Sequence, residues 1–150
     1  MRFTPLRQVG RRTRENRAAH LRDWQAILAR AGRRCEGCGV RDASLQDAHL
    51  AGRPGSGACL GPWANAPELR AALCCADPRT GLLGCHEKID RNLDPELRDR
   101  LRWAAARRLL ARLHGRAVAF RRVNDDGTEA EPLDVIRGLV RELEVEGMEP

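Results

Sequence analysis

Four cysteines have the residue type and the spacing of metal ligands. Cys35 and Cys38 are separated by two residues, and Cys74 and Cys85 follow further along the chain of 150 residues. Four thiolates hold zinc in a tetrahedral arrangement, and a close pair supplies two of them from one turn. Glycines inside and after the close pair allow the backbone to curl around an ion. The sequence therefore predicts a structural zinc site.

Two further cysteines leave the ligand set open at one position. Cys75 directly follows Cys74, and only one of the two is expected to ligate. We favour Cys74, which follows the apolar Leu73, with Cys75 as the alternative. Cys59 is then expected to be an ordinary buried thiol. The alternative explanation for all six cysteines is that they are ordinary buried thiols that bind no metal. Disulfides are disfavoured because no secretory segment follows Met1.

Histidines lie between and directly after the cysteine pairs. His49 ends the segment LQDAH, and His86 directly follows the last cysteine. Asp90 comes four residues after His86, a spacing that places both side chains on one face of a helix, where they can share a metal ion. The other two histidines, His20 and His114, lie in arginine-rich helical segments and are expected at the surface.

The whole arrangement resembles the HNH endonuclease family. The segments that carry the resemblance are CEGCG at 35–39, DAHL at 47–50, then Asn65, and LCC and GCHEKID at 73–75 and 84–90. The basic helix before CEGCG is also similar to that of small HNH proteins from phages and actinobacteria. The resemblance covers residues 16–92 and implies a ββα-metal finger. In that fold a hairpin carries the first histidine, a loop the asparagine and a helix the last histidine.

The resemblance implies hydrolysis of phosphodiester bonds in DNA, and we expect low sequence specificity. His49 would be the general base that takes a proton from the attacking water, and Asn65 would hold the His49 side chain or its loop. His86 would bind a divalent ion, Mg²⁺, Mn²⁺ or another, with Asp90 or Asp47 as oxygen ligands. This ion is distinct from the structural zinc and would stabilise charge on the phosphate and on the leaving oxygen.

The chain departs from the family directly before the base. The family has a His or Asp there as a metal ligand, and this chain has Ala48. Either Asp47 supplies the oxygen, or His49 is itself the metal ligand and Leu50 takes the base position, which would leave the site inactive. Asn65 lies farther from the second cysteine pair than the family's asparagine. The spacer before the last cysteine is also longer, which a bulging loop accommodates at small entropic cost.

Two other functions fit the same residues. A non-catalytic, zinc-containing DNA-binding protein on a degenerate HNH fold would need the cysteines and a basic surface but neither His49 nor Asp90. A protein-interaction module would instead use the C-terminal helices, to bind a second copy of the chain or a phage or host protein. Divalent-metal-dependent cleavage of DNA separates the nuclease from both.

Arginine dominates the charge of the chain and favours DNA as its partner. Lys88 is the only lysine, so 26 of the 27 basic residues are arginine, and the net charge is +6. Arginine contacts phosphate through paired donors. Ten arginines against two acids give residues 1–34 a net charge of +8; compositional bias and a solvated tail are the alternatives. The predicted DNA contacts are Arg11, Arg12, Arg14, Arg33, Arg34 and Arg53.

The elements that must position these residues follow from the hydrophobic pattern. We expect a basic flexible arm over 1–15, a nuclease core over 16–92 and a helical extension over 93–150. The expected fold is α+β, with a small zinc-stabilised ββα-metal core and flanking helices. Elements expected in the core are a helix over 16–31, a strand over 44–50, a helical turn over 67–74 and a helix that opens at 85–91.

The extension is expected to be mainly helical. Apolar stripes predict helices over 94–114 and 133–143, with a strand over 117–123 between them. The arginine-rich face of the first helix either contacts phosphate or is solvated. The acidic last helix is expected to avoid DNA and to pack on the preceding helix or to form a dimer contact. No apolar run reaches 18 residues, so we expect a cytoplasmic protein without a membrane span.

Overall fold

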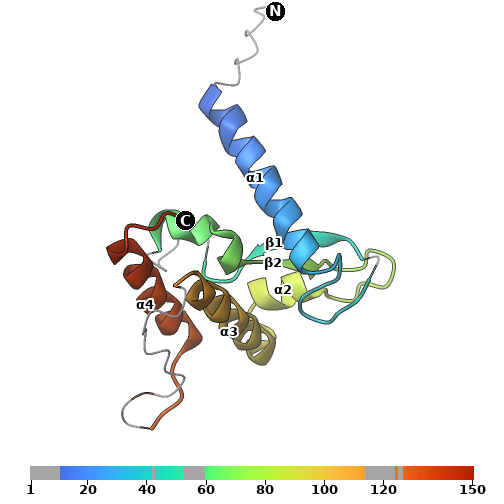
Figure 1. The fold of residues 1–150 in the computed structure, drawn as a ribbon. Coiled ribbons are helices and arrows are strands. Elements are labelled where there is room, and N and C mark those ends of the chain that lie inside the picture. The colour runs from blue at the N-terminus through green and yellow to red at the C-terminus, as the bar shows by residue number, and fades with distance from the viewer. Residues whose placement is uncertain (1–10, 42, 53–59, 114–123, 125–126) are drawn as a thin grey trace, which may run out of the picture.

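The described part of the chain is a mixed helix and strand structure of the α+β class, as predicted (Figure 1). The computed structural model describes residues 11–41, 43–52, 60–113, 124 and 127–150. Side chains are described from residue 16 onwards. Sequence predictions that lie outside the described residues concern Arg53, Cys59, His114, the strand over 117–123 and the side chains of Arg11, Arg12 and Arg14.

Helix α1, Arg11–Arg30, projects from the body of the molecule (Figure 1). It begins earlier than predicted. Residues 11–15 are helical, so the prediction of a flexible arm is wrong for these residues. These residues include no glycine or proline, and the helix therefore extends back through them. Ile27, which is fully buried, anchors the other end near the sheet. The helix stops where Gly32 adopts a positive φ of 60°, as the sequence predicted.

Two antiparallel strands, β1 (Leu45–His49) and β2 (Arg70–Cys74), form the sheet. Leu45 faces Cys74 and His49 faces Arg70 across it. The helical turn predicted over 67–74 is correct only for its first residues, which form the 3₁₀ helix η2, Pro67–Leu69. All five residues of β2 are buried, so the strand has no alternation of apolar and polar residues to reveal it.

Three helices follow the sheet, close to where the sequence predicted them. Helix α2, Cys85–Asp90, contacts β2. Helix α3, Pro95–Arg112, begins at Asp94, whose carboxylate accepts the backbone N–H of Leu97 at 3.0 Å. Helix α4, Pro132–Val145, packs on α3. Within the described ranges, no helix combines the length and the apolar character that crossing a membrane requires.

One hydrophobic cluster extends through the described residues from Cys35 to Leu143. Trp63 of the 3₁₀ helix η1, Gly61–Asn65, and Leu109 of α3 are both at most 2% exposed within it. The boundary predicted near residue 92 falls in the turn between helices that end at Asp90 and begin at Pro95, and the core is continuous across it.

Three arginines of α3 donate to the protein's own backbone around the sheet. Arg100 donates to the carbonyl oxygen of Gly37 at 2.6 Å, and Arg102 donates to that of Leu50 at 2.8 Å. Arg108 donates to the carbonyl oxygen of Glu68 at 3.0 Å. These bonds attach α3 to the loops around the sheet, so this face is used in packing and is neither simply solvated nor simply a phosphate-binding face.

Candidate metal centre and active site

The four predicted cysteines come together in one cluster. The Sγ atoms of Cys35, Cys38, Cys74 and Cys85 all lie within 4.8 Å of one another. Three of these residues are buried, and Cys38 is exposed. Cys74 is the member from the adjacent pair, as predicted, while Cys75 lies outside the cluster. Four sulfurs at this separation can hold a metal ion such as zinc.

Backbone amides point at the sulfurs of this cluster. The N–H groups of Gly37 and Cys74 each donate to Cys35 Sγ at 3.3 Å, and the N–H of Cys85 donates to Cys74 Sγ at 3.4 Å. Burial by itself raises the pKa of Cys35, but backbone N–H donors at Cys74, Cys38 and Gly37 lower that pKa to about 7. Metal ligation needs the thiolate form, which these amide donors stabilise.

Glycines allow the close approaches that the cluster needs. A Cβ atom at Gly37 would lie 2.8 Å from Cys85 Sγ. At Gly84, a Cβ atom would overlap the backbone of Cys74 and Cys75. Gly84 therefore lets the start of α2 lie directly against the end of β2, and this contact places Cys85 beside Cys74.

We expect Gly84→Ala to destabilise the protein by about 3 kcal/mol, since backbone atoms cannot move aside as a flexible side chain can. Urea unfolding, with the zinc content measured beside it, checks this. Gly138→Ala is the matched control, because a Cβ there meets nothing within 4 Å and Gly138 lies in α4. That control should be neutral or up to ~1 kcal/mol more stable. Equal stability of the two variants would contradict the prediction.

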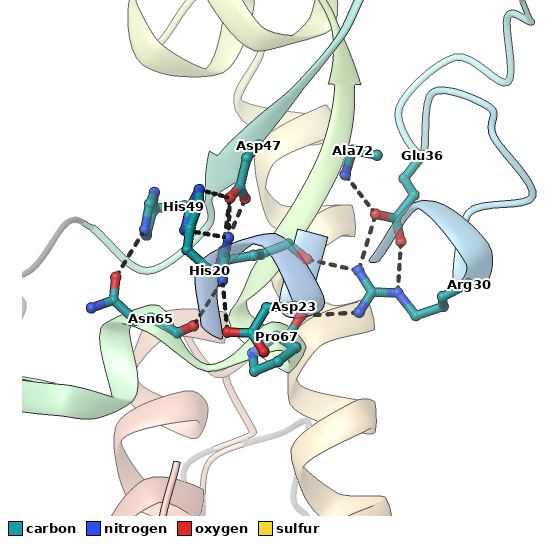
Figure 2. Close-up of polar contacts among 10 residues, drawn as sticks. His20, Asp23, Arg30, Glu36, Asp47, His49, Asn65, Pro67 and Ala72 are labelled. Atoms are coloured by element: carbon teal, nitrogen blue, oxygen red, sulfur yellow. Dashed lines mark hydrogen bonds and ion pairs between the residues drawn. The ribbon is translucent and has the colours of Figure 1, made fainter. Parts of the chain in front are cut away.

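Glu36, inside the first cysteine turn, joins that turn to three other elements. Its carboxylate accepts from Arg30 of α1 at 3.1 Å and from Arg108 of α3 at 2.9 Å. It also accepts the backbone N–H of Ala72 in β2 at 2.9 Å (Figure 2). The cysteine cluster, the sheet and two helices are therefore held in one arrangement.

His49 and Asn65 lie together beside the sheet, as Figure 2 shows. His49 ends β1, and Asn65 ends η1, where the buried Trp63 holds the short helix in the core. The Nε2 atom of His49 lies 3.2 Å from Oδ1 of Asn65. With this oxygen as acceptor, the His49 proton is on Nε2 and the lone pair is on Nδ1. The contact expected between these two residues is therefore present.

Asp47 is paired with a buried arginine instead of with the other predicted metal ligands. Arg70 is 1% exposed, and its Nε donates to both carboxylate oxygens of Asp47 at 3.0 Å. A buried guanidinium needs such a counter-charge, because removing it from water unpaired is costly. Among the described residues, Asp47, His86 and Asp90 form no common ligand cluster. The carboxylate of Asp47 is therefore engaged by Arg70, and its role as an oxygen ligand of the catalytic metal stays a prediction.

His86 and Asp90 share one face of α2, as their spacing predicted. Nε2 of His86 lies 3.9 Å from a carboxylate oxygen of Asp90, whose side chain is 53% exposed. At the position before His49, by contrast, Ala48 is only 2% exposed and offers no ligand. The pair on α2 therefore presents one nitrogen and one accessible carboxylate oxygen on the same face of the helix.

Comparison with known proteins leaves this site to be interpreted from its own residues. No family model, curated protein or solved structure matches the chain. The described residues show a four-cysteine cluster, a histidine bound to an asparagine, and a histidine–aspartate pair on a short helix.

Three residues of this region were not predicted from the sequence. Arg70 Nη2 lies 3.2 Å from His20 Nδ1, and Arg70 Nη1 lies 3.4 Å from Asp23 of the same helix α1. His20 is exposed, as predicted, but it is also part of this polar network. The signals in the sequence were a lone arginine in an apolar segment and a His and an Asp three residues apart on a helix.

Proposed function

We propose that this chain is a metal-dependent nuclease of the HNH type that hydrolyses phosphodiester bonds in DNA with low sequence specificity. The observation that carries the proposal is the contact of His49 with Asn65 at 3.2 Å, at the end of β1. The order β1, β2, α2 is that of the ββα-metal finger implied by the resemblance. The cysteine cluster connects the end of β2 to the start of α2 and serves as the structural zinc site.

His49 is the proposed general base. Its Nε2–H donates to Asn65, so Nδ1 keeps a lone pair that accepts a proton from the attacking water. Asn65 in turn fixes the orientation of the imidazole ring. A base held in this way needs no rotation before each proton transfer.

His86 and Asp90 would hold the catalytic divalent ion. One imidazole and one exposed carboxylate suit Mg²⁺ or Mn²⁺, which keep several positions for water and phosphate oxygens. Such an ion supplies positive charge against the scissile phosphate and the leaving oxygen. Asp47 is left out of this ligand set because its carboxylate neutralises Arg70.

Nicking of supercoiled plasmid DNA tests the proposal. The purified, zinc-loaded chain is expected to convert the plasmid to its nicked form with Mg²⁺ or Mn²⁺ and to stop when EDTA removes the weakly held ion. A zinc-loaded protein that binds DNA but never cuts it, with any divalent ion, would refute the nuclease.

A second candidate is a non-catalytic, zinc-containing DNA-binding or protein-interaction module on a degenerate HNH fold. The buried Ala48, at the position where the family has a metal ligand, favours it. The cysteines favour it too, because among the described residues they form the only cluster of three or more metal ligands. The same plasmid assay separates the two candidates.

Arg33 and Arg34 lie exposed beside the cysteine turn and are proposed to bind phosphate groups of DNA. Changing both to Gln should reduce the slope of log binding constant against log salt concentration by about 0.9 for each phosphate that is no longer neutralised. The matched control changes the exposed Arg107 and Arg141 to Gln, which removes the same charge from α3 and α4. Fluorescence anisotropy with a short duplex at several salt concentrations measures both slopes. Equal slopes in the two double variants would remove Arg33 and Arg34 from the interface.

A further inference from the structure

The buried Arg70 guanidinium joins three elements at one end of the sheet. Nε donates to Asp47 of β1, and Nη1 donates to the carbonyl oxygen of Asn65 in η1 at 3.2 Å. From α1, Asp23 accepts at 3.4 Å and the Nδ1 atom of His20 lies at 3.2 Å. A guanidinium that is 1% exposed persists only with its donors satisfied, so this geometry is strongly determined.

The bond from Arg70 fixes the chemical form of His20. A guanidinium only donates hydrogen bonds, so Nδ1 of His20 must accept and carries a lone pair. The hydrogen of the neutral imidazole is then on Nε2. The His20 side chain is 58% exposed, and its Nε2 lies 3.8 Å from Asp47, beyond a good hydrogen bond. Among the described residues, this N–H is therefore a fixed donor, and the carboxylate of Asp47 beside it lies beyond hydrogen-bonding distance.

The same guanidinium also holds the partner of His49. Arg70 faces His49 across the two strands, and its Nη1 binds the backbone of Asn65, whose side chain binds His49. Figure 2 shows His20 and His49 in this one network, contributed by α1 and β1. The two histidines therefore have a common support, although they are 29 positions apart in the chain.

We propose that α1 completes the active site and that His20 is a catalytic residue whose Nε2–H donates to a non-bridging oxygen of the scissile phosphate. This inference rests on the proposed nuclease function. A neutral donor fixed in advance stabilises the charge that develops on the phosphate without reorganisation during the reaction. No proton is transferred at His20; the proton of the attacking water goes to His49.

Two variants of His20 separate a donor role from a structural one. His20→Asn keeps an acceptor near the position of Nδ1 for Arg70 but has no donor at the position of Nε2, and should lower kcat for plasmid nicking about 10²-fold. His20→Gln places an amide N–H near the position of Nε2 and should recover most of that loss. Both should keep the melting temperature and zinc content of the wild type. Gln25→Ala, exposed on the same helix, is the control and should cut normally.

A binding measurement separates this inference from the nuclease itself. The histidine nitrogens are followed by ¹⁵N NMR while a short DNA duplex is added in Mg²⁺-free buffer, and His20 Nε2–H is expected to shift. If the wild type cuts DNA and His20→Asn cuts equally well, the role of His20 is refuted and the nuclease stands. If the wild type never cuts but His20 Nε2–H shifts on binding, the nuclease is refuted and the phosphate contact stands. If the wild type does not cut DNA and His20 Nε2–H does not shift, both the nuclease and the phosphate contact are refuted.

Discussion

His49→Ala is expected to lower the rate of DNA cleavage about 10²–10⁴-fold, the usual contribution of a general base. The side chain ends strand β1 and its described hydrogen bond goes to Asn65, so its removal should leave the fold intact. Nicking of supercoiled plasmid with Mg²⁺ or Mn²⁺ measures the loss. Elemental analysis of zinc on the same sample shows whether the cysteine cluster is still loaded.

Two companion variants make this result specific to the base. Gln46→Ala changes an exposed residue of the same strand and should cut as fast as the wild type. Asn65→Ala should reduce the rate less than His49→Ala, because it removes the group that orients the base and leaves the base itself. A zinc-loaded His49→Ala that nicks plasmid as fast as the wild type would show that another group takes the proton.

Cys35→Ser is expected to release the structural metal and unfold the region around the sheet. Zinc binding to small metal-stabilised folds contributes ~10 kcal/mol or more of folding free energy, comparable to the whole stability of a domain. Cys35 is 2% exposed and its sulfur accepts two backbone amides, so its loss affects both the metal and the turn around it. Thermal unfolding followed by circular dichroism, with zinc analysis, measures the effect.

The chain offers a matched control for the cysteine variant. Cys75→Ser alters the neighbour of a ligand. Because Cys75 lies outside the cluster, the variant protein should keep its zinc and nearly all its stability. Removal of zinc from the wild type by a strong chelator should reproduce the unfolding of Cys35→Ser. Loss of zinc from Cys75→Ser but not from Cys74→Ser would exchange the two ligand assignments.

Much of the cysteine cluster and most helices could be predicted because their signals are local. A two-residue spacing with glycines defines half of a zinc site within one turn. Asp94 followed by a proline and an acid marks the start of α3, and Gly32 marks the end of α1. Each of these signals depends on residues within one or two turns of backbone, so it survives in any tertiary context.

Features that depend on partners far along the chain could not be predicted. The segment RAALC reads as helical by composition, yet pairing with β1 makes it strand β2. Asp47 has the chemistry of a metal ligand, but its carboxylate pairs with Arg70, 23 residues away. Likewise, the arginines of α3 have the charge to bind phosphate, but four of them donate to backbone carbonyls of the protein itself.

The sequence by itself therefore determined the ligand types, the helix boundaries at strong caps and the placement of His86 and Asp90 on one helix face. The sequence favoured Cys74 and implied the contact of His49 with Asn65, but only the tertiary structure decided that α1 brings His20 to Arg70 and that Arg70 holds the backbone of Asn65. The physical reason is the buried guanidinium of Arg70. Because its charge must be satisfied by acceptors from three separate elements, the arrangement of that site exists only once those elements have packed together.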